Sequence, residues 1–360
     1  MNLDMSMFCV LCGSPFDLEP HIYNIDPDSE HFKWTYDVRL LCNPPALCHL
    51  QIDPSGEIAK IDSGSSDVFL SEITRWHMGD GDFFVLNNNH YLTLHNDQTG
   101  NLIFPLHDAC IQIAVKVIDL DRKVPSRSIS TLSLLYRSLC WKFHDRKFYD
   151  VGMGMDILGL DSTCDECGPN SMLALSSVSM WSGDYERYLT DPLKVPGITT
   201  FLSSILETTP QDGNHSSQTL HATREPEGLE NLPNELLDRI TDFLPPQSMI
   251  ALRRVSKTLA VKVRLDHRFW RNNVLDGTLL PHLWELDGAG PELERLRGES
   301  RLPNDYIWNW RSLAELLSRR QFPISRRDPR LEGVPDGYWN RCRIWNIVKE
   351  SLPFDHARFA

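Results

Sequence analysis

Short apolar runs separated by turn residues characterise the first part of the chain. Between residues 82 and 107, apolar stretches at Phe83–Leu86 and at 91–94 are flanked by Asn, Asp and Gly. This alternation of apolar runs and turn residues predicts two β-strands.

From His107 onward the spacing of apolar residues changes from strand-like to helical. They now recur at steps of three and four, as one face of an α-helix requires. The residues concerned are Ile111, Ala114, Val115 and Ile118. A second helix is expected over 130–143. We therefore predict a mixed α+β domain over residues 1–204.

The segment that follows is polar. Residues 207–228 hold almost no large apolar side chains, so they cannot bury enough surface to offset the entropy lost on ordering. We predict a disordered linker over 205–228.

A strongly helical pattern occupies residues 229–275. Leu-Pro at 232–233 precedes apolar residues at three- and four-residue steps, and Pro245-Pro246 is expected to stop this first helix. Ser256 is a suitable N-cap for a third helix. Three helices of this size bury little surface. Such a unit completes its core against a partner or against the neighbouring C-terminal helices.

The residue order in this unit closely resembles the F-box, a module that docks proteins into Skp–cullin–F-box ubiquitin ligases. The resemblance rests on L-P-x-E-L-L-x-x-I, then F-L, then L-R-x-V-S-K, then a late Trp. Gln247–Ser248 and Val261-Lys262 depart from common family residues. The resemblance implies binding to a Skp-type adaptor and, through it, to a cullin. The expected adaptor-binding residues are Leu232, Pro233, Leu236, Leu237, Ile240, Leu244, Leu252, Val255 and Trp270.

The resemblance implies a non-catalytic, substrate-recognition subunit of the ligase, with the flanking regions holding an unknown protein substrate. The alternative is a metal-stabilised regulatory or structural protein whose F-box-like helices pack internally. The two hypotheses differ in whether the apolar stripe of the first helix is exposed or covered.

Residues 276–360 are predicted to form a mainly helical, Trp-rich C-terminal region, with helices near 306–320 and 339–351. Five of the ten tryptophans lie here, at Trp284, Trp308, Trp310, Trp339 and Trp345. The chain also resembles, more loosely, a group of fungal F-box proteins with an N-terminal cysteine-rich part, an H-x-x-C element and an R-x-R-I-W stretch. The last of these corresponds to residues 341–345 here.

Charge and composition narrow the class of protein. The net charge is −13 and the acidic excess precedes residue 229, so we expect no nucleic-acid binding there, since phosphate would be repelled. A basic excess after residue 250 leaves that question open for the C-terminal region. The chain has no apolar run of membrane-spanning length and no signal-peptide pattern at its start. We expect a cytoplasmic or nuclear protein with reduced cysteines.

Two cysteines near the N-terminus have the spacing of a zinc knuckle. Cys9 and Cys12 are followed by Gly13, which permits a tight turn. His107 and Cys110 lie three apart at the predicted start of a helix, so both face the same way. Together the four residues predict a structural, treble-clef-like Zn²⁺ site. The competing interpretation is a cluster of ordinary buried thiols.

A second C-x-x-C pair, Cys164 with Cys167, is a weaker candidate, for which Cys42 with Cys48 or His49 are potential partners. No phosphate-binding loop, serine elbow or catalytic cysteine setting is found in the sequence. We therefore expect no enzymatic activity.

Overall fold

The computed structural model describes residues 8–16, 26, 29–43, 68–74, 83–86, 89–92, 102–121, 130–145, 156–160, 164–165, 168–169, 171–172, 186–207, 227–263, 265–287, 308–318, 329–331 and 333–352. The chain forms two compact units. Unit 1 combines residues 1–196 with 334–360, and unit 2 spans 197–333. The first unit is thus discontinuous in sequence.

Unit 1 contains a three-stranded antiparallel sheet in the order β2-β1-β5. Strand β1 (Val38–Cys42) pairs with β2 (Phe69–Leu70) on one side and with β5 (Ile103–His107) on the other. The register places Val38 opposite His107. Every residue of β5 is buried, so the strand that ends at His107 runs through the core.

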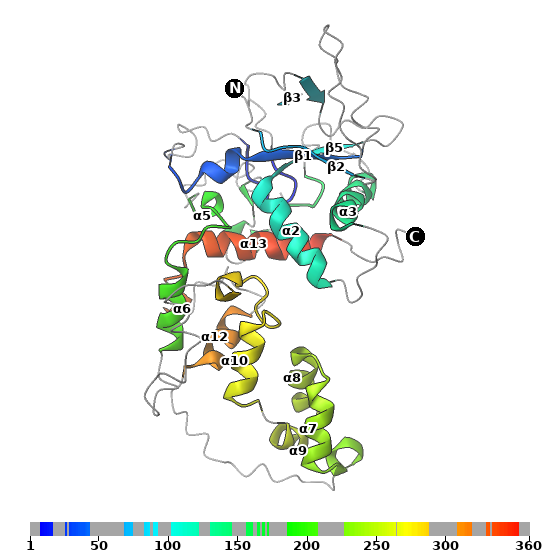
Figure 1. Ribbon diagram of the computed structural model, residues 1–360, viewed down its shortest axis with the longest axis vertical. Coiled ribbons are helices and arrows are strands. Elements are labelled where there is room, and N and C mark those ends of the chain that lie inside the picture. The colour runs from blue at the N-terminus through cyan, green and yellow to red at the C-terminus, as the bar shows by residue number, and fades with distance from the viewer. Residues whose placement is uncertain are drawn as a thin grey trace. The chain divides into compact units, whose positions relative to one another are not determined.

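Helices cover this sheet. Helix α2 (Asp108–Asp121) follows β5 directly and contacts both β5 and α3 (Thr131–Asp145). The C-terminal helix α13 (Asp336–Ser351) packs against α2 and against the short α5 (Glu186–Leu189). Helix α2 therefore lies between the sheet and α13 (Figure 1). The helices predicted from residue 107 and over 130–143 are confirmed.

Smaller elements complete unit 1. A 3-10 helix, η1, spans Lys33–Tyr36. Strands β3 (Phe83–Leu86) and β4 (Asn89–Leu92) form one hairpin, and β6 (Cys164–Asp165) and β7 (Gly168–Pro169) form another. The predicted strand at 83–86 is confirmed. The strand predicted at 91–94 begins at Asn89 instead, and residues 93 and 94 lie outside the described residues.

Unit 2 is helical throughout its described part. It starts with α6 (Ile198–Leu206), which packs against α12 (Trp310–Leu317). Between them come η3 (Gly228–Asn231), α7 (Asn234–Asp242), α8 (Pro246–Val255), α9 (Lys257–Lys262), α10 (His267–Leu275) and η4 (Trp284–Asp287), and η6 (Pro329–Leu331) follows α12. The 229–275 segment thus holds four α-helices in its described part, one more than the three expected, because Trp270 lies on a helix of its own. The mixed α+β class is confirmed, with helices predominating.

The packing of the chain divides it differently from the domain boundaries expected from sequence. The region expected at 276–360 contributes to both units, because α13 belongs to unit 1 while α12 belongs to unit 2. The start of the expected linker is helical, with Ile205 and Leu206 buried at the end of α6, and residues 208–226 lie outside the described residues.

The C-terminal tryptophans are mostly core residues. Trp308, Trp310, Trp339 and Trp345 are all buried, which explains the richness of this region in Trp without an interface. Among the helices that the structure describes, none is long and apolar enough to cross a membrane.

Candidate functional site

The helical unit at 229–275 has a small core of its own. Leu237 of α7 is fully buried against Leu259 of α9 and Val263. Three partly buried residues pack around them: Leu232, Met249 and Leu252. One side of α7 is thereby used for internal packing.

A neighbouring face of α7, which starts one residue from Leu237, presents apolar side chains to solvent. Leu236 is 50% exposed, Ile240 37% and Phe243 88%. These three residues are spaced at i, i+4 and i+7, so they lie on one face of the helix, which we call the α7 outer face. Further exposed apolar side chains in the same unit are Leu229, Val255 and Val261. Large apolar side chains gathered in this way on a surface are typical of interaction sites.

Local interactions explain why these helices begin and end where they do. The Ser256 side chain accepts a hydrogen bond from the Leu259 backbone N–H at 3.1 Å, which confirms the predicted N-cap of α9. Asp266 caps α10 in the same way. Pro245 and Pro246 start α8, as N-cap and first helical residue, in addition to following α7.

Lys262 fixes the segment that leads into α7. Its ammonium group donates to the backbone carbonyls of Glu230 at 2.7 Å and Leu232 at 2.9 Å. These bonds connect the end of α9 to the residues that precede α7, so α7 is held in place from its N-terminal side.

The residues expected to bind an adaptor divide into three groups by exposure. Pro233, Leu236, Ile240 and Val255 are exposed, Leu232, Leu244 and Leu252 are partly buried, and Leu237 and Trp270 are buried. Trp270 packs edge-to-face with Phe269 and donates from Nε1 to the Leu265 carbonyl at 3.2 Å. The expected set omitted Phe243, the most exposed large apolar residue of the unit. The sequence contained a sign of this, because a residue seven positions after Leu236 lies on the same face of a helix.

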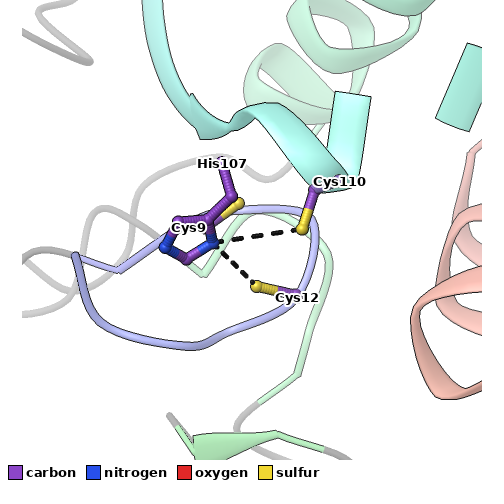
Figure 2. A group of neighbouring side chains, drawn as sticks. All are labelled: Cys9, Cys12, His107 and Cys110. Atoms are coloured by element: carbon purple, nitrogen blue, oxygen red, sulfur yellow. Dashed lines mark hydrogen bonds between the residues drawn. The ribbon is translucent and has the colours of Figure 1, made fainter. Parts of the chain in front are cut away.

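The four predicted zinc ligands come together in unit 1. Cys9, Cys12, His107 and Cys110 are all buried, and their ligand atoms lie within 4.8 Å of one another. His107 Nδ1 is 3.4 Å from the Cys12 sulfur and 4.0 Å from the Cys110 sulfur. Figure 2 shows these two thiols around the imidazole, with Cys9 behind it. Residues almost a hundred positions apart in sequence therefore form one cluster.

Backbone geometry shapes the knuckle that carries Cys9 and Cys12. The Cys9 carbonyl accepts from the N–H groups of Cys12 at 3.3 Å and Gly13 at 2.8 Å, and the Cys9 N–H donates to Ser14 at 2.9 Å. Gly13 has φ +64°, and a Cβ there would lie 2.5 Å from the Cβ of Ser171. Only glycine fits this turn, as the sequence suggested.

The second pair of predicted ligands lies at a strand-to-helix junction. His107 ends β5, and Cys110 lies in the first turn of α2. Asp108, between them, forms an ion pair with Arg39, whose Nε lies 2.7 Å from Oδ1, and the Asp108 backbone N–H donates to the Asp37 carbonyl at 2.8 Å. The two contacts anchor the start of α2 to β1 and to the residue that precedes it, which keeps His107 and Cys110 facing the knuckle.

The electrostatics of the cluster favour a negative charge on one sulfur. Burial by itself raises the pKa of the Cys12 thiol, but hydrogen bonds from Cys110 and Cys9 and the charge of His107 bring that pKa well below its usual value. Burial lowers the pKa of His107, yet the charges of Cys12 and Cys9 raise it to about 10. The pKa of Cys110 is well above its usual value, through burial and through its hydrogen bonds to the other thiols.

These properties suit a metal ion. Zinc takes the place of thiol and imidazole protons, because its ligands are thiolate and neutral imidazole. Bonds of about 2.0–2.3 Å put tetrahedral ligand atoms roughly 3.3–3.8 Å apart. The 3.4 Å contact between Cys12 and His107 already has this length, and small side-chain rotations would close the wider ones.

Aromatic rings enclose the imidazole. The rings of Phe16 and Trp34 meet that of His107 edge-to-face, with centroids 4.8 and 4.9 Å away. His107 Nε2 is buried and has no hydrogen-bond partner among the described residues. The polar contacts of the ring are therefore made by Nδ1, which faces the sulfurs of Cys12 and Cys110.

The second predicted knuckle falls mostly outside the described residues, which do not include Cys167, Cys48 or His49. The backbone of Cys164 belongs to β6. Cys42 is buried on β1 as a free thiol, and burial raises its pKa to about 12.

The comparisons with known proteins concern the helical unit. Residues 229–276 match the family model described as F-box-like. Searches of curated proteins and of solved structures found no match to the chain. The chain therefore carries an F-box-like domain.

Proposed function

We propose that this protein is a substrate-recognition subunit of a Skp–cullin–F-box ubiquitin ligase, which binds the Skp-type adaptor through residues 229–276. The observation that supports this most directly is the α7 outer face, formed by Leu236, Ile240 and Phe243. F-box domains bind Skp-type adaptors in cullin complexes, and this domain exposes an apolar helix face of the kind that such docking needs.

The energetics favour docking of this face onto a partner. Burying a Leu, Ile or Phe side chain contributes roughly 1.5–3 kcal/mol. The internal core of the domain is small, with Leu237, Leu259 and Val263 at its centre. The three large apolar side chains on the neighbouring face of α7 contribute little to the stability of the isolated domain, and a partner that covers them gains the free energy of their burial.

The alternative, in which the F-box-like helices serve internal packing alone, requires a cover over the same face. Within the described part of unit 2, α10 packs against α12. Leu236 and Ile240 of α7, and Phe243 at its C-cap, are exposed. The exposure of this face favours the docking function over the alternative.

F-box domains are generally adaptor modules rather than catalytic ones. We propose that this chain likewise transfers no ubiquitin itself and holds a protein substrate near the ubiquitin carrier, with the regions flanking the domain supplying the substrate-binding surface.

Co-purification with a Skp-type adaptor tests the docking function. The full chain and the adaptor are expressed together, and the adaptor is captured. The wild type should be retained and a Leu236→Asp variant lost. Retention of both, or of neither, would contradict adaptor docking through α7.

We also propose that Cys9, Cys12, His107 and Cys110 bind one structural Zn²⁺. Three thiolates and one imidazole are a ligand set typical of structural zinc sites, and four protein ligands leave no open position for catalysis. The complete burial of all four residues supports a structural role. Zinc content of the purified, untagged chain, measured by mass spectrometry, tests this proposal.

A further inference from the structure

Two arginines of the C-terminal helix are buried inside unit 1. Arg341 has no exposed surface and Arg343 is 3% exposed. Both belong to the R-x-R-I-W stretch of α13, whose role the F-box does not account for. Burying a guanidinium is costly unless its N–H groups are hydrogen-bonded, so the partners of these side chains identify what the stretch does.

Arg343 reaches the metal-binding knuckle. Its Nη1 donates to the carbonyl oxygen of Cys12 at 2.6 Å, across 331 positions of sequence. Its Nε and Nη2 donate to Asn340 Oδ1 at 3.1 and 2.8 Å, which fixes the orientation of the guanidinium. The same group lies over the ring of Tyr188, 5.2 Å from its centroid.

Asn340 extends the connection to the segment around α5. Its side-chain amide donates to the carbonyls of Tyr188 at 3.0 Å and Thr190 at 2.9 Å. The hydroxyl of Ser14, in the knuckle, donates to the same Tyr188 carbonyl at 3.5 Å. The knuckle, the α5 segment and α13 thus share one hydrogen-bonded network.

Arg341 fastens α13 to the residues at which the chain leaves unit 1. It donates from Nε to the Pro192 carbonyl at 2.6 Å and from Nη2 to the Leu193 carbonyl at 3.1 Å. At Gly337 a Cβ would lie 2.4 Å from the Asp191 carbonyl oxygen. Glycine, which has no Cβ, therefore allows α13 to approach this segment closely. The chain leaves unit 1 after Pro196 and returns at Val334.

The charge of the site gives Arg343 a second role. Three thiolates, one neutral imidazole and Zn²⁺ carry a net charge of −1, because the three sulfur charges exceed the two of the ion. A guanidinium buried against the backbone of one ligand compensates this charge where water cannot. Side chains that support metal ligands in this way affect metal affinity by roughly 10- to 100-fold.

We infer that α13 is part of the metal site through Arg343, so that metal binding and docking of the C-terminal helix are coupled. This inference rests on the proposed zinc site. The ion that closes the N-terminal knuckle also holds the helix to which the chain returns after the F-box-like domain. Loss of the metal therefore loosens the packing of α13 within unit 1.

Hydrogen–deuterium exchange on the full chain tests the coupling. Chelation of the zinc should increase exchange in residues 336–351 together with residues 8–16, while residues 234–275 keep their protection. Opening of the knuckle with unchanged protection of 336–351 would overturn the coupling and leave the zinc proposal intact. A wild type that contains no zinc would instead overturn the zinc proposal and, with it, this inference.

Zinc affinity of Arg343 variants, measured by competition with a chromogenic chelator, gives a second test. Arg343→Gln should weaken binding by roughly 10- to 100-fold, and Arg343→Lys should retain part of the affinity because the charge is kept. Arg311→Gln is the matched control, since Arg311 pairs with Glu315 on the exposed face of α12. An Arg343→Gln affinity equal to that of the control would overturn the role of Arg343. Should the Gln variant fail to fold, the exchange experiment on the wild type still decides.

Discussion

Leu236 and Leu237 are adjacent on helix α7, yet the first is 50% exposed and the second is completely buried. Leu237 packs against Leu259 and Val263 inside the F-box-like domain, whereas Leu236 belongs to the α7 outer face. Substitutions at these two positions should therefore have different effects. A change at Leu237 acts on the stability of the domain, and a change at Leu236 acts on its ability to dock.

Replacement of Leu236 by Asp should remove adaptor binding and leave the domain folded. Burial of one Leu at an interface contributes roughly 1.5–3 kcal/mol, and a buried carboxylate without a partner adds a larger cost. The expected loss of affinity is at least about tenfold, measured by calorimetry with a Skp-type adaptor. Asp238 is an exposed polar residue of the same helix. The variant Asp238→Asn is therefore the control and should bind as the wild type does. Unchanged affinity of Leu236→Asp would contradict docking through this face.

Replacement of Leu237 by Ala should act on stability instead. Truncating a fully buried Leu costs about 2–5 kcal/mol, which is large for a domain of this size. Thermal unfolding followed by circular dichroism should show a lowered transition for the helical part. Adaptor affinity measured well below that transition should change much less than in Leu236→Asp. A larger loss of adaptor affinity in Leu237→Ala than in Leu236→Asp would contradict the assignment of Leu237 to the core and Leu236 to the interface.

Phe243→Ser should weaken adaptor binding with little effect on stability. The Phe243 side chain is 88% exposed, and changes at exposed positions usually alter stability by less than about 0.5 kcal/mol. Aromatic residues are frequent among the side chains that dominate interface affinity. Adaptor binding and the melting temperature, measured on one preparation, check both statements. A variant that binds normally would exclude Phe243 from the interface.

Cys110→Ala should abolish stoichiometric zinc binding, because three remaining ligands cannot close the tetrahedron. Cys42→Ala is the matched control, since Cys42 is also a fully buried free thiol but lies on β1 and outside the cluster. Metal content by mass spectrometry should be one zinc for the wild type and Cys42→Ala, and below that for Cys110→Ala. Equal zinc content in both variants would show that Cys110 is no ligand.

Gly13→Ala should destabilise unit 1. The residue has φ +64°, and an added Cβ would meet Ser171 at 2.5 Å. The left-handed conformation alone costs about 1–2 kcal/mol for other residues, and the steric contact adds to it. Gly197→Ala is a control with the same backbone strain, at φ +77°, but open space around the Cβ. The Gly13 variant should show the larger fall in melting temperature, and equal falls would mean that the close approach to Ser171 has no effect.

Features that depend on near neighbours could be predicted from the order of the amino acids alone. Periodicity predicted α2 and α3, Ser256 marked the start of α9, and the order of residues indicated the F-box-like domain. The spacing of Cys9 with Cys12, and of His107 with Cys110, also indicated which side chains lie next to each other, because the two residues of each pair lie within one turn of the chain.

Which face of each element is buried, and which distant segments meet, could be learned from the folded structure but not from local sequence patterns. A helical stripe does not distinguish Leu236 from Leu237, since the choice depends on where α9 packs. No local pattern indicated that α13 belongs to unit 1, or that Arg343 donates to the carbonyl of Cys12. Such contacts join residues hundreds of positions apart, and their stability comes from burial and hydrogen bonds that exist only once the whole unit has folded.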